Sequence, residues 1–435
     1  MTADRTELRR LEVGALARVE GEGALRVRIQ GARVEEASLE IYEPPRFFEA
    51  LLRGRSFTEA PDITSRICGI CPVAYQTSAV HALEDACQVT ASPAVRDLRR
   101  LLYCGEWIQS HALHIYLLHA PDFLGYESAL ELAKAAPDTV QRGLMLKKAG
   151  NELMATIGGR AVHPVTMRVG GFHSVPARPQ LLALRGQLEG ALEAAEETVR
   201  WVAGFDFPDF RHDHEYVALR AADRYPIESG RLVSDGGLDI APDEFEAHVD
   251  ELHVEHSSAL HGVLRGRDSY MTGPLARYSL NFDRLTERAQ AAARAAGLGS
   301  SCRNPFQSIV VRSVEVVYAL EEALTLIERY QPPEPPAASV KPRAATGFGW
   351  SEAPRGVRYH RYTLAADGTI LEAVITPPTA QNQRAIEADL ARFVEAHLDL
   401  DDDEHRWRCE QAIRNYDPCI SCATHFLELD VEREP

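Results

Sequence analysis

The sequence predicts a mainly helical α+β protein, with a core of long helices and small β-sheets near both ends of the chain. Between about residues 45 and 330, apolar residues recur three and four positions apart, which is the period of amphipathic helices. Short strand-like runs flank this region on both sides. Hydrophobic residues make up 45% of the 435 positions, which is enough to form a large buried core.

Residues 8–43 are expected to form short strands, because the runs ALARVEG, ALRVRIQ and ARVEEASLEIYE have a β-like pattern that glycines interrupt. From about residue 45 the pattern becomes helical. Pro121 is expected to end the helix that begins near residue 93. Long helices are predicted at about 93–119, 125–157, 179–204, 242–263 and 303–330.

The C-terminal part, about residues 344–425, is predicted to contain both strands and helices. The proline-rich segment 331–343 precedes it and is expected to be a surface connection, because it has no regular period. A hairpin is predicted around Asp367-Gly368, and helices at about 381–397 and 405–415 follow it. No internal repeat is apparent, so residues 1–425 are predicted to form one integrated domain.

Composition restricts the partners and the location of the chain. The formal net charge is −17 and no cluster of lysine and arginine is present, so nucleic-acid binding is not expected. No segment approaches the roughly eighteen apolar residues that a membrane span requires. The N-terminal segment lacks the apolar centre of a secretory signal. A cytoplasmic location is therefore predicted, unless a partner subunit carries an export signal.

Four of the eight cysteines form two Cys-x-x-Cys pairs, Cys68 with Cys71 before a predicted helix and Cys419 with Cys422 after one. Thiolates three residues apart can bind one metal, and four of them suit zinc, an iron–sulfur cluster, or nickel and iron. Structural zinc modules hold their two pairs roughly 15–20 residues apart. Here nearly the whole chain separates the pairs, so the fold must bring them together, as it does in catalytic metal sites.

The motifs RICGIC and DPCxxCxxH that contain these pairs resemble the paired signatures of the large subunits of nickel–iron hydrogenases. The resemblance extends along nearly the whole chain through RVEGEG, FEALLRGR, EWIQSHALHIY, GGRAVHPVTMRVGG, EAPRG and PPTAQN. It implies the hydrogenase large-subunit fold and the reversible heterolytic cleavage of H2 to protons and electrons. RICGICPVAYQ is most similar to the cytoplasmic, bidirectional NAD(P)-linked (sulfhydrogenase-like) branch.

The resemblance also implies two metal sites. Cys68 and Cys419 match terminal nickel ligands, and Cys71 and Cys422 match ligands that bridge nickel and an iron carrying CO and CN−. Glu49 and the histidine that ends the second motif, His425, match residues that help to bind a magnesium ion, partly through water.

Further residues match the surroundings of the metal pair in the family. Glu20 in RVEGEG corresponds to the proton-relay glutamate, whereas Glu22 is expected to be exposed. Arg355 in EAPRG corresponds to an arginine above the metals, where a fixed cation can stabilise developing charge. The acidic partners of this arginine and the pocket around the cyanides correspond to Asp122, Asp417, Pro354 and Thr379.

Each of these residues could also have an ordinary structural role. Arg355 could form a surface salt bridge, Asp122 follows Pro121 at a helix end, and Asp417 could be a turn or N-cap residue. The histidines of the family-like segments are expected to be hydrogen-bonded core residues rather than ligands; they are His111, His114, His119 and His163.

The chain differs from many relatives at one position, and a short segment follows the second cysteine motif. Tyr75 stands where many relatives have a histidine after the first cysteine motif. Residues 426–435 follow His425 and match a maturation tail that a dedicated protease removes after nickel insertion. No second iron–sulfur motif is present, so an iron–sulfur small subunit is expected, with flavin- and NAD(P)-binding diaphorase subunits beyond it.

Three other functions fit parts of the pattern. An H2-sensing regulatory hydrogenase has the same site but normally lacks a cleavable tail. A core subunit of respiratory complex I shares the fold but lacks the full set of nickel ligands. A structural zinc protein would explain the cysteines, but not EAPRG or RVEGEG.

Overall fold

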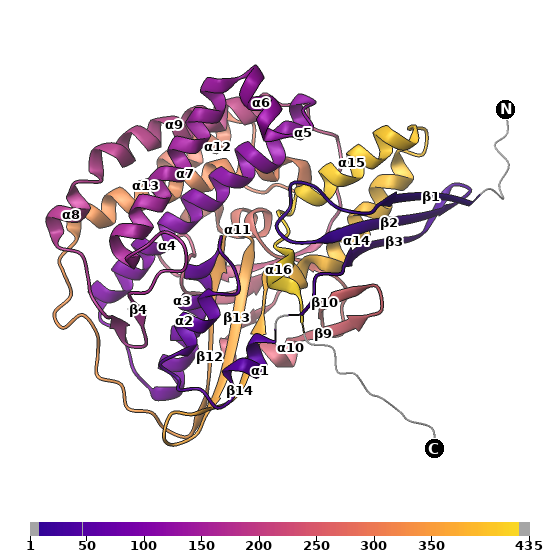
Figure 1. The fold of residues 1–435 in the computed structure, drawn as a ribbon. Coiled ribbons are helices and arrows are strands. Elements are labelled where there is room, and N and C mark those ends of the chain that lie inside the picture. Colours follow the sequence, from indigo (N-terminus) through magenta and orange to yellow (C-terminus); the bar gives the residue numbers. More distant parts are fainter. Residues whose placement is uncertain (1–7, 46, 426–435) are drawn as a thin grey trace, which may run out of the picture.

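A computed structural model of the chain describes residues 8–45 and 47–425. Four long helices pack side by side in its largest layer, at the upper left of Figure 1. They are α4 (Pro93–Leu113), α7 (Pro137–Gly158), α9 (Arg185–Ala203) and α13 (Ser308–Arg329). All residues from Leu98 to Ala112 are buried, because α4 is covered by both α7 and α13.

Helices α4 and α7 approach each other closely at two glycines. A Cβ atom on Gly105 would lie 3.0 Å from the Gly150 carbonyl oxygen, and one on Gly150 would lie 2.6 Å from the Gly105 carbonyl oxygen. Only residues without a side chain permit this backbone contact. The contact fixes α4 along one edge of the region that carries the first cysteine pair.

An antiparallel sheet lies below the helical layer in Figure 1. Its order is β12-β13-β14, formed by Ala345–Ala353, Gly356–Leu364 and Ile370–Thr376. Helix α3 (Pro72–Cys87) packs on β12 and β13. Cβ atoms at Gly347 and Gly349 would lie 2.1 and 2.4 Å from backbone atoms of Ala82, so α3 rests directly on the sheet backbone. The hairpin predicted around Asp367-Gly368 is confirmed by β13 and β14.

A second antiparallel sheet projects from the body at the right of Figure 1. Its order is β1-β2-β3, formed by Leu8–Val13, Gly23–Gln30 and Arg33–Ile41. Helix α14 (Pro378–Ala396) packs against β3, and α15 (Asp402–Arg414) packs against β1. The short helix α16 (Ile420–Ala423) lies between this sheet and the body of the molecule, where residues from both ends of the chain meet (Figure 1).

The helix predicted at 242–263 is wrong. After α10 (Phe245–His248) the chain forms a hairpin of β9 (Val249–Val254) and β10 (Ser257–Leu264). In DELHVEHSSALHGVL, apolar residues also occur at helical spacings, but burial alternates in part along β10 and the hairpin packs on α14. Tertiary packing therefore overrides the local pattern.

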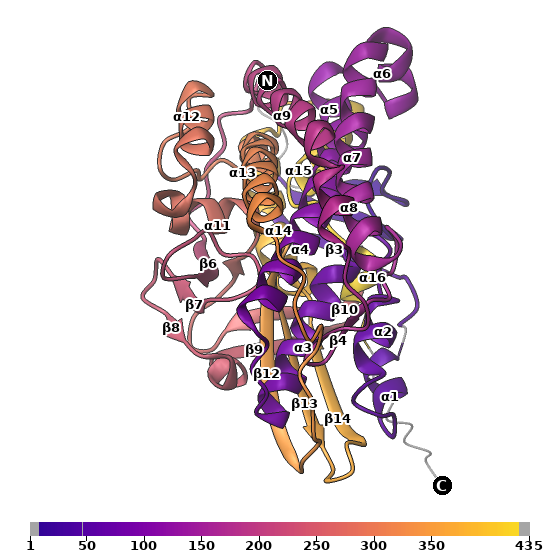
Figure 2. The same cartoon turned by 90° about the vertical axis from the view of Figure 1, so that its left-hand side faces the viewer.

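A four-stranded sheet of order β11-β6-β7-β8 lies on the other side of α13 from α7 (Figure 2). Its strands are Tyr270–Met271, Glu215–Arg220, Arg231–Ser234 and Asp239–Ile240. The remaining α-helices and strands are α1 (Phe48–Leu52), α2 (Ala60–Ser65), α5 (Ala120–Leu124), α6 (Ala129–Ala135), α8 (Arg178–Leu182), α11 (Pro274–Asn281), α12 (Glu287–Ala295), β4 (Met167–Arg168) and β5 (Gly171–Phe172).

Two predicted helices differ in their bounds. Pro121 does not end the helix that begins at Pro93: α4 continues into a π-helical turn, His114–His119, and Pro121 lies in the first turn of α5. The helix predicted at 125–157 is divided into α6 and α7 at Pro137, because proline favours a helix start. None of the helices in the described ranges combines the length and apolar composition of a membrane span.

The contact between α4 and α7 can be tested with Gly150→Ala. The new methyl group would meet the Gly105 carbonyl oxygen at 2.6 Å, and overpacking of this kind costs about 1–3 kcal/mol. A Cβ at the exposed helical Gly190 meets nothing within 4 Å, so Gly190→Ala is expected to stabilise α9 by about 0.5–1 kcal/mol. Calorimetry should show a lower melting temperature for the first variant only; an unchanged temperature would contradict the close contact.

Candidate metal centre

The fold brings the two cysteine pairs into one buried cluster. The Sγ atoms of Cys68 and Cys419 are 3.5 Å apart, those of Cys71 and Cys422 are 3.6 Å apart, and all four lie within 4.8 Å of one another. Cys71 precedes α3 and Cys419 precedes α16, so each pair lies at a helix start. The convergence predicted from the sequence is confirmed.

The protein environment favours the charged thiolate form at some of the four cysteines and the neutral thiol at others. Backbone N–H groups of Ile70 and Cys71 donate to the Cys68 sulfur at 3.3 and 3.4 Å. Burial raises the pKa of the Cys419 thiol, whereas hydrogen bonds from neighbouring cysteines overcome burial and lower the pKa of Cys422. Four buried thiolates together would repel one another, so this donor set fits a thiophilic cation among them.

Arg355 lies in the turn between β12 and β13 and is held by Asp417. Its Nε donates to the Asp417 carbonyl oxygen at 2.7 Å, and its Nη2 donates to the carboxylate at 3.0 Å. Both side chains are buried, so the alternative of a surface salt bridge for Arg355 is wrong. Asp417 is not a helix N-cap either, because Cys419 has that position in α16. Within the described residues, Arg355 Nη1 and Asp417 Oδ2 have no hydrogen-bond partner, which leaves room for a polar ligand.

Asp122 is not a partner of Arg355, contrary to the expectation from the resemblance. Its carboxylate accepts two hydrogen bonds from the Arg414 guanidinium, at 2.7 and 2.8 Å, and one from Arg18 at 2.6 Å. Arg18 lies two residues before Glu20, and Arg414 lies three residues before Asp417. Asp122 therefore joins the two segments that deliver these acidic residues to the cysteine cluster.

Glu20 lies directly against the cysteine cluster. Its Oε2 is 3.0 Å from the Cys419 sulfur and accepts the Ser421 N–H at 3.1 Å. Burial and the nearby Cys422 raise the pKa of this carboxyl. Glu22 is exposed, as predicted. Glu43, which no motif singled out, accepts the Ser421 hydroxyl at 2.8 Å and so extends the polar contacts of Glu20 outward.

Glu49 and His425 meet beside a cavity that also reaches the cysteines. The His425 Nε2 atom is 3.1 Å from Glu49 Oε2, while the Ile375 N–H donates to Glu49 Oε1 at 2.7 Å. The cavity has a volume of about 320 Å³, and its lining includes Tyr75 and Cys422. Glu251, which the sequence did not indicate, lies near both residues, and burial raises its pKa to about 7.

Thr379 and Pro354, the two residues expected around the cyanides, each form one hydrogen bond that holds the site in place. Thr379 accepts the Cys419 N–H at 3.0 Å through its hydroxyl oxygen. The carbonyl of Pro354 accepts Arg277 Nη2 at 3.2 Å, and Arg277 in turn pairs with buried Glu315 and Glu352. The EAPRG turn is therefore fixed from behind by a buried ionic network.

Two more residues at the cluster had no role predicted from the sequence, although Glu106 begins the family-like segment EWIQSHALHIY. Arg358 donates from Nη2 to the Cys71 sulfur at 3.5 Å, and its guanidinium lies 3.4 Å from the ring centroid of Tyr75. Glu106 accepts the N–H groups of Val73 and Ala74 at 2.6 and 3.1 Å, at the start of α3. Burial raises the pKa of Glu106 to about 8. Both residues support the segment that carries Cys71.

The family-like histidines lie outside the cluster. His111 contacts Glu315 at 2.9 Å, His114 contacts the Arg414 carbonyl at 2.8 Å, and His163 contacts the Ser65 carbonyl at 2.7 Å. The two ring nitrogens of buried His119 have no hydrogen-bond partner within the described part of the chain. His111 and His114 are therefore buried and hydrogen-bonded, as predicted.

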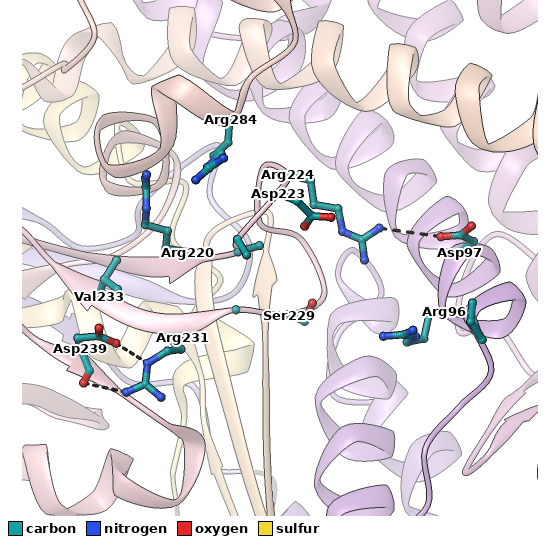
Figure 3. A pocket seen from close by; sticks show the side chains of 14 residues that line it. Arg96, Asp97, Arg220, Asp223, Arg224, Ser229, Arg231, Val233, Asp239 and Arg284 are labelled. Carbon is teal, nitrogen blue, oxygen red and sulfur yellow. Dashed lines mark hydrogen bonds and ion pairs between the residues drawn. The ribbon is translucent and has the colours of Figure 1, made fainter.

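A larger cavity of about 680 Å³ lies away from the cysteines, between the start of α4 and strands β6 and β7 (Figure 3). Several arginines line it, and they face acidic residues. Arg231 is 2.5 Å from Asp239, and Arg224 is 3.9 Å from Asp97. None of the predicted site residues lines this cavity. The larger cavity is therefore not the candidate metal centre, because the four buried thiols lie elsewhere.

Comparisons with known proteins agree with this geometry. The family model for the nickel-dependent hydrogenases matches residues 46–144. The α subunit of sulfhydrogenase 1 from Pyrococcus furiosus is 32% identical over 423 residues, covering 96% of this chain and 98% of that protein. The β subunit of the NAD-reducing hydrogenase HoxS from Cupriavidus necator is 28% identical, covering 96% and 95%.

Solved structures extend the comparison to the fold. An NAD+-reducing [NiFe]-hydrogenase in the H2-reduced state aligns with a TM-score of 0.86 and 26% identity, covering 96% of this chain and 99% of that one. A Ni-Fe-Se hydrogenase from D. vulgaris Hildenborough shares the fold, with a TM-score of 0.77. Identity above 30% along nearly the whole length of both chains shows that this protein belongs to the nickel-dependent hydrogenases, as the large subunit of an enzyme that acts on H2.

Proposed function

We propose that the four cysteines hold a nickel–iron pair, with Cys68 and Cys419 as terminal nickel ligands and Cys71 and Cys422 as bridging ligands. The single observation that carries this proposal is the buried cluster of four sulfurs within 4.8 Å. When bound, the metal pair supplies the site at which H2 is polarised and from which electrons leave. The unpartnered Nη1 of Arg355 beside the cluster supports CO and CN− on the iron, because a buried donor without a partner costs about 1–3 kcal/mol.

Glu20 is proposed to take the proton that H2 cleavage releases. Its Oε2 lies within reach of the Cys419 sulfur, and its raised pKa suits a group that accepts a proton and later releases it. Ser421 connects Glu20 to Glu43, because its N–H contacts the first carboxylate and its hydroxyl contacts the second. The amide N–H of Ser421 cannot relay a proton, so these contacts are proposed to hold Glu43 near Glu20 as the next acceptor on the way out.

The other side of the metal pair is proposed to be formed by Arg355, Asp417, Pro354 and Thr379. Burial opposes a charge on Arg355, but Asp417 and the thiols raise its pKa, so the guanidinium stays positive. Asp122 is proposed to position the segments on either side rather than to contact Arg355. Glu49 and His425 are proposed to bind Mg2+ with water, since they offer an oxygen and a nitrogen at one point.

The similarity to subunits of multi-subunit hydrogenases implies partner subunits. We propose an iron–sulfur small subunit as the first electron acceptor, followed by flavin- and NAD(P)-binding diaphorase subunits in the cytoplasm. Residues 1–425 are proposed to act as one domain. Residues 426–435 lie outside the described residues, and their removal after His425 by a maturation protease stays a prediction. The comparisons favour this enzyme over an H2 sensor, a complex I core subunit or a zinc protein.

The proposed metal pair can be tested on the purified complex. Elemental analysis is expected to show one nickel per chain together with iron, and infrared spectroscopy is expected to show bands of iron-bound CO and CN−. Partner clusters also contain iron, so the infrared bands identify the iron of this site. Zinc in place of nickel, without those bands, would overturn the proposal.

The proton path can be tested with Glu20→Gln, which keeps the shape of the side chain but cannot accept a proton. H2 oxidation is expected to fall by about 10²–10⁴-fold, with nickel content unchanged. Glu22→Gln is the matched control, because Glu22 is exposed and only two residues away. Full activity in Glu20→Gln would exclude Glu20 from the path, and loss of nickel would show a structural role instead.

The role of Arg355 can be tested with Arg355→Lys, which keeps the charge but loses the planar fork. Turnover is expected to fall by about 10²–10³-fold, the range for loss of one fixed electrostatic donor. The CN− stretching bands should shift as well. Arg361→Lys on the same sheet is the control, because Arg361 pairs with Glu246 and Glu372 near the surface. Normal turnover and unshifted bands in Arg355→Lys would refute the assignment.

A further inference from the structure

A second group of metal-ligating side chains lies outside the cysteine centre. His212 and His214 belong to the segment between α9 and β6, and Asp389 belongs to α14. Asp389 Oδ1 lies 2.5 Å from His212 Nδ1 and 2.6 Å from His214 Nε2, so one carboxylate oxygen faces both imidazoles. The two ring centroids are 4.0 Å apart.

The cluster is buried except at one edge. His214 and Asp389 are almost fully buried, whereas 26% of the His212 side chain is exposed. The hydroxyl of Tyr416 donates to Asp389 Oδ2, on the side of the carboxylate away from the histidines. Solvent therefore reaches the cluster through His212, which provides an access route for an ion.

The charge of Asp389 is stabilised by hydrogen bonds from His212, His214 and Tyr416 and, in the described part of the chain, not by a lysine or arginine. Within the described ranges, its ion pairs are with His212 and His214 only, and no arginine or lysine forms one with it. The nearby Arg303 pairs with Asp235 and donates to the His214 backbone carbonyl instead. A buried carboxylate that has no lysine or arginine partner is a suitable ligand for a divalent cation, whose charge would balance it.

The orientation of His214 also suits a ligand. Its Nδ1 lies 3.5 Å from the Ser269 hydroxyl, while its Nε2 faces Asp389. When Nδ1 carries the proton toward Ser269, the Nε2 lone pair points at the carboxylate, and the two lone pairs repel unless a cation lies between them. Metal-ligating histidines usually have a polar partner at the other ring nitrogen, which fixes the tautomer, and Ser269 is in position for that role.

We propose that His212, His214 and Asp389 bind a divalent transition-metal ion of the zinc class, separate from the nickel–iron centre. Two imidazole nitrogens and one carboxylate oxygen form a common donor set for Zn2+, with water at the fourth position. The ion connects the 204–214 segment to α14, and Tyr416 joins the site through its hydrogen bond to Asp389. Because Tyr416 directly precedes Asp417, the site stabilises the segment that leads into the second cysteine motif.

A similar group on the same helix serves as a comparison. Glu387 lies 2.7 Å from His256 Nε2 but 3.7 Å from His261 Nδ1, and its Oε1 also accepts the Leu39 N–H at 3.0 Å. This carboxylate already has a backbone donor, and its second histidine is farther away. His256→Gln is therefore a matched control that breaks a histidine–carboxylate pair on α14 without removing a proposed ligand.

The test uses the purified complex with its partner subunits, after treatment with a chelator and titration with Zn2+ or Co2+ alone. The wild type and His256→Gln should bind one ion per chain, give visible Co2+ bands and gain melting temperature. His212→Gln should bind more than about 100-fold more weakly, beyond the loss typical of outer-shell changes, while its nickel content stays the same.

His212 is the preferred substitution because it lies at the exposed edge, and Asp389→Asn provides a second variant. A wild type that binds neither ion would overturn the proposal and leave a hydrogen-bonded cluster. Equal binding by His212→Gln, or loss of binding in His256→Gln alone, would overturn the assignment to these residues. Nickel content and infrared bands report on the cysteine centre independently, so a failure of the zinc-site proposal can be distinguished from a failure of the nickel–iron proposal.

Discussion

Mutual repulsion among four buried sulfurs is the constraint on which the rest of the structure depends. Two unit charges 4 Å apart repel by about 4 kcal/mol at the effective dielectric of a protein, so several thiolates cannot share this space without cations. The four Sγ atoms lie within 4.8 Å of one another. The scaffold must therefore hold them in place before any metal is bound, and it must direct positive groups toward them.

Both requirements are met by elements that are far apart in the sequence. Helix α3, which follows Cys71, rests on the backbone of β12 at two glycines, and Glu106 accepts its first N–H groups. The second pair is positioned by the hydroxyl of Thr379 and by the neighbouring strand residue Glu20. The two arginines near the sulfurs, Arg355 and Arg358, both come from the β12–β13 hairpin, so one hairpin supplies the cations.

The sequence was sufficient where function is carried by local motifs, and insufficient where it is carried by packing. The convergence of the cysteines could be predicted from their two motifs, because two Cys-x-x-Cys pairs so far apart indicate a metal site that the whole fold assembles. The partners of Asp122 could not be predicted, since Arg18 and Arg414 lie at opposite ends of the chain. Glu43 and Glu251 have no motif, and only the fold brings them near Ser421 and His425. The hairpin at Val249–Leu264 depends on its contact with α14, which no local pattern shows.

The backbone of Asp417 shows how the scaffold holds the arginine side of the cluster. Its φ of 51° lies in the left-handed region, which costs a residue with a side chain about 1–3 kcal/mol. Two charge-assisted bonds from Arg355 offset that cost, one to the carbonyl and one to the carboxylate. The same turn places Pro418 and Cys419 next in the chain, so the orientation of the guanidinium and the position of a thiol are set together. Loss of either partner is therefore expected to move both the guanidinium of Arg355 and the sulfur of Cys419, although they come from opposite ends of the C-terminal part.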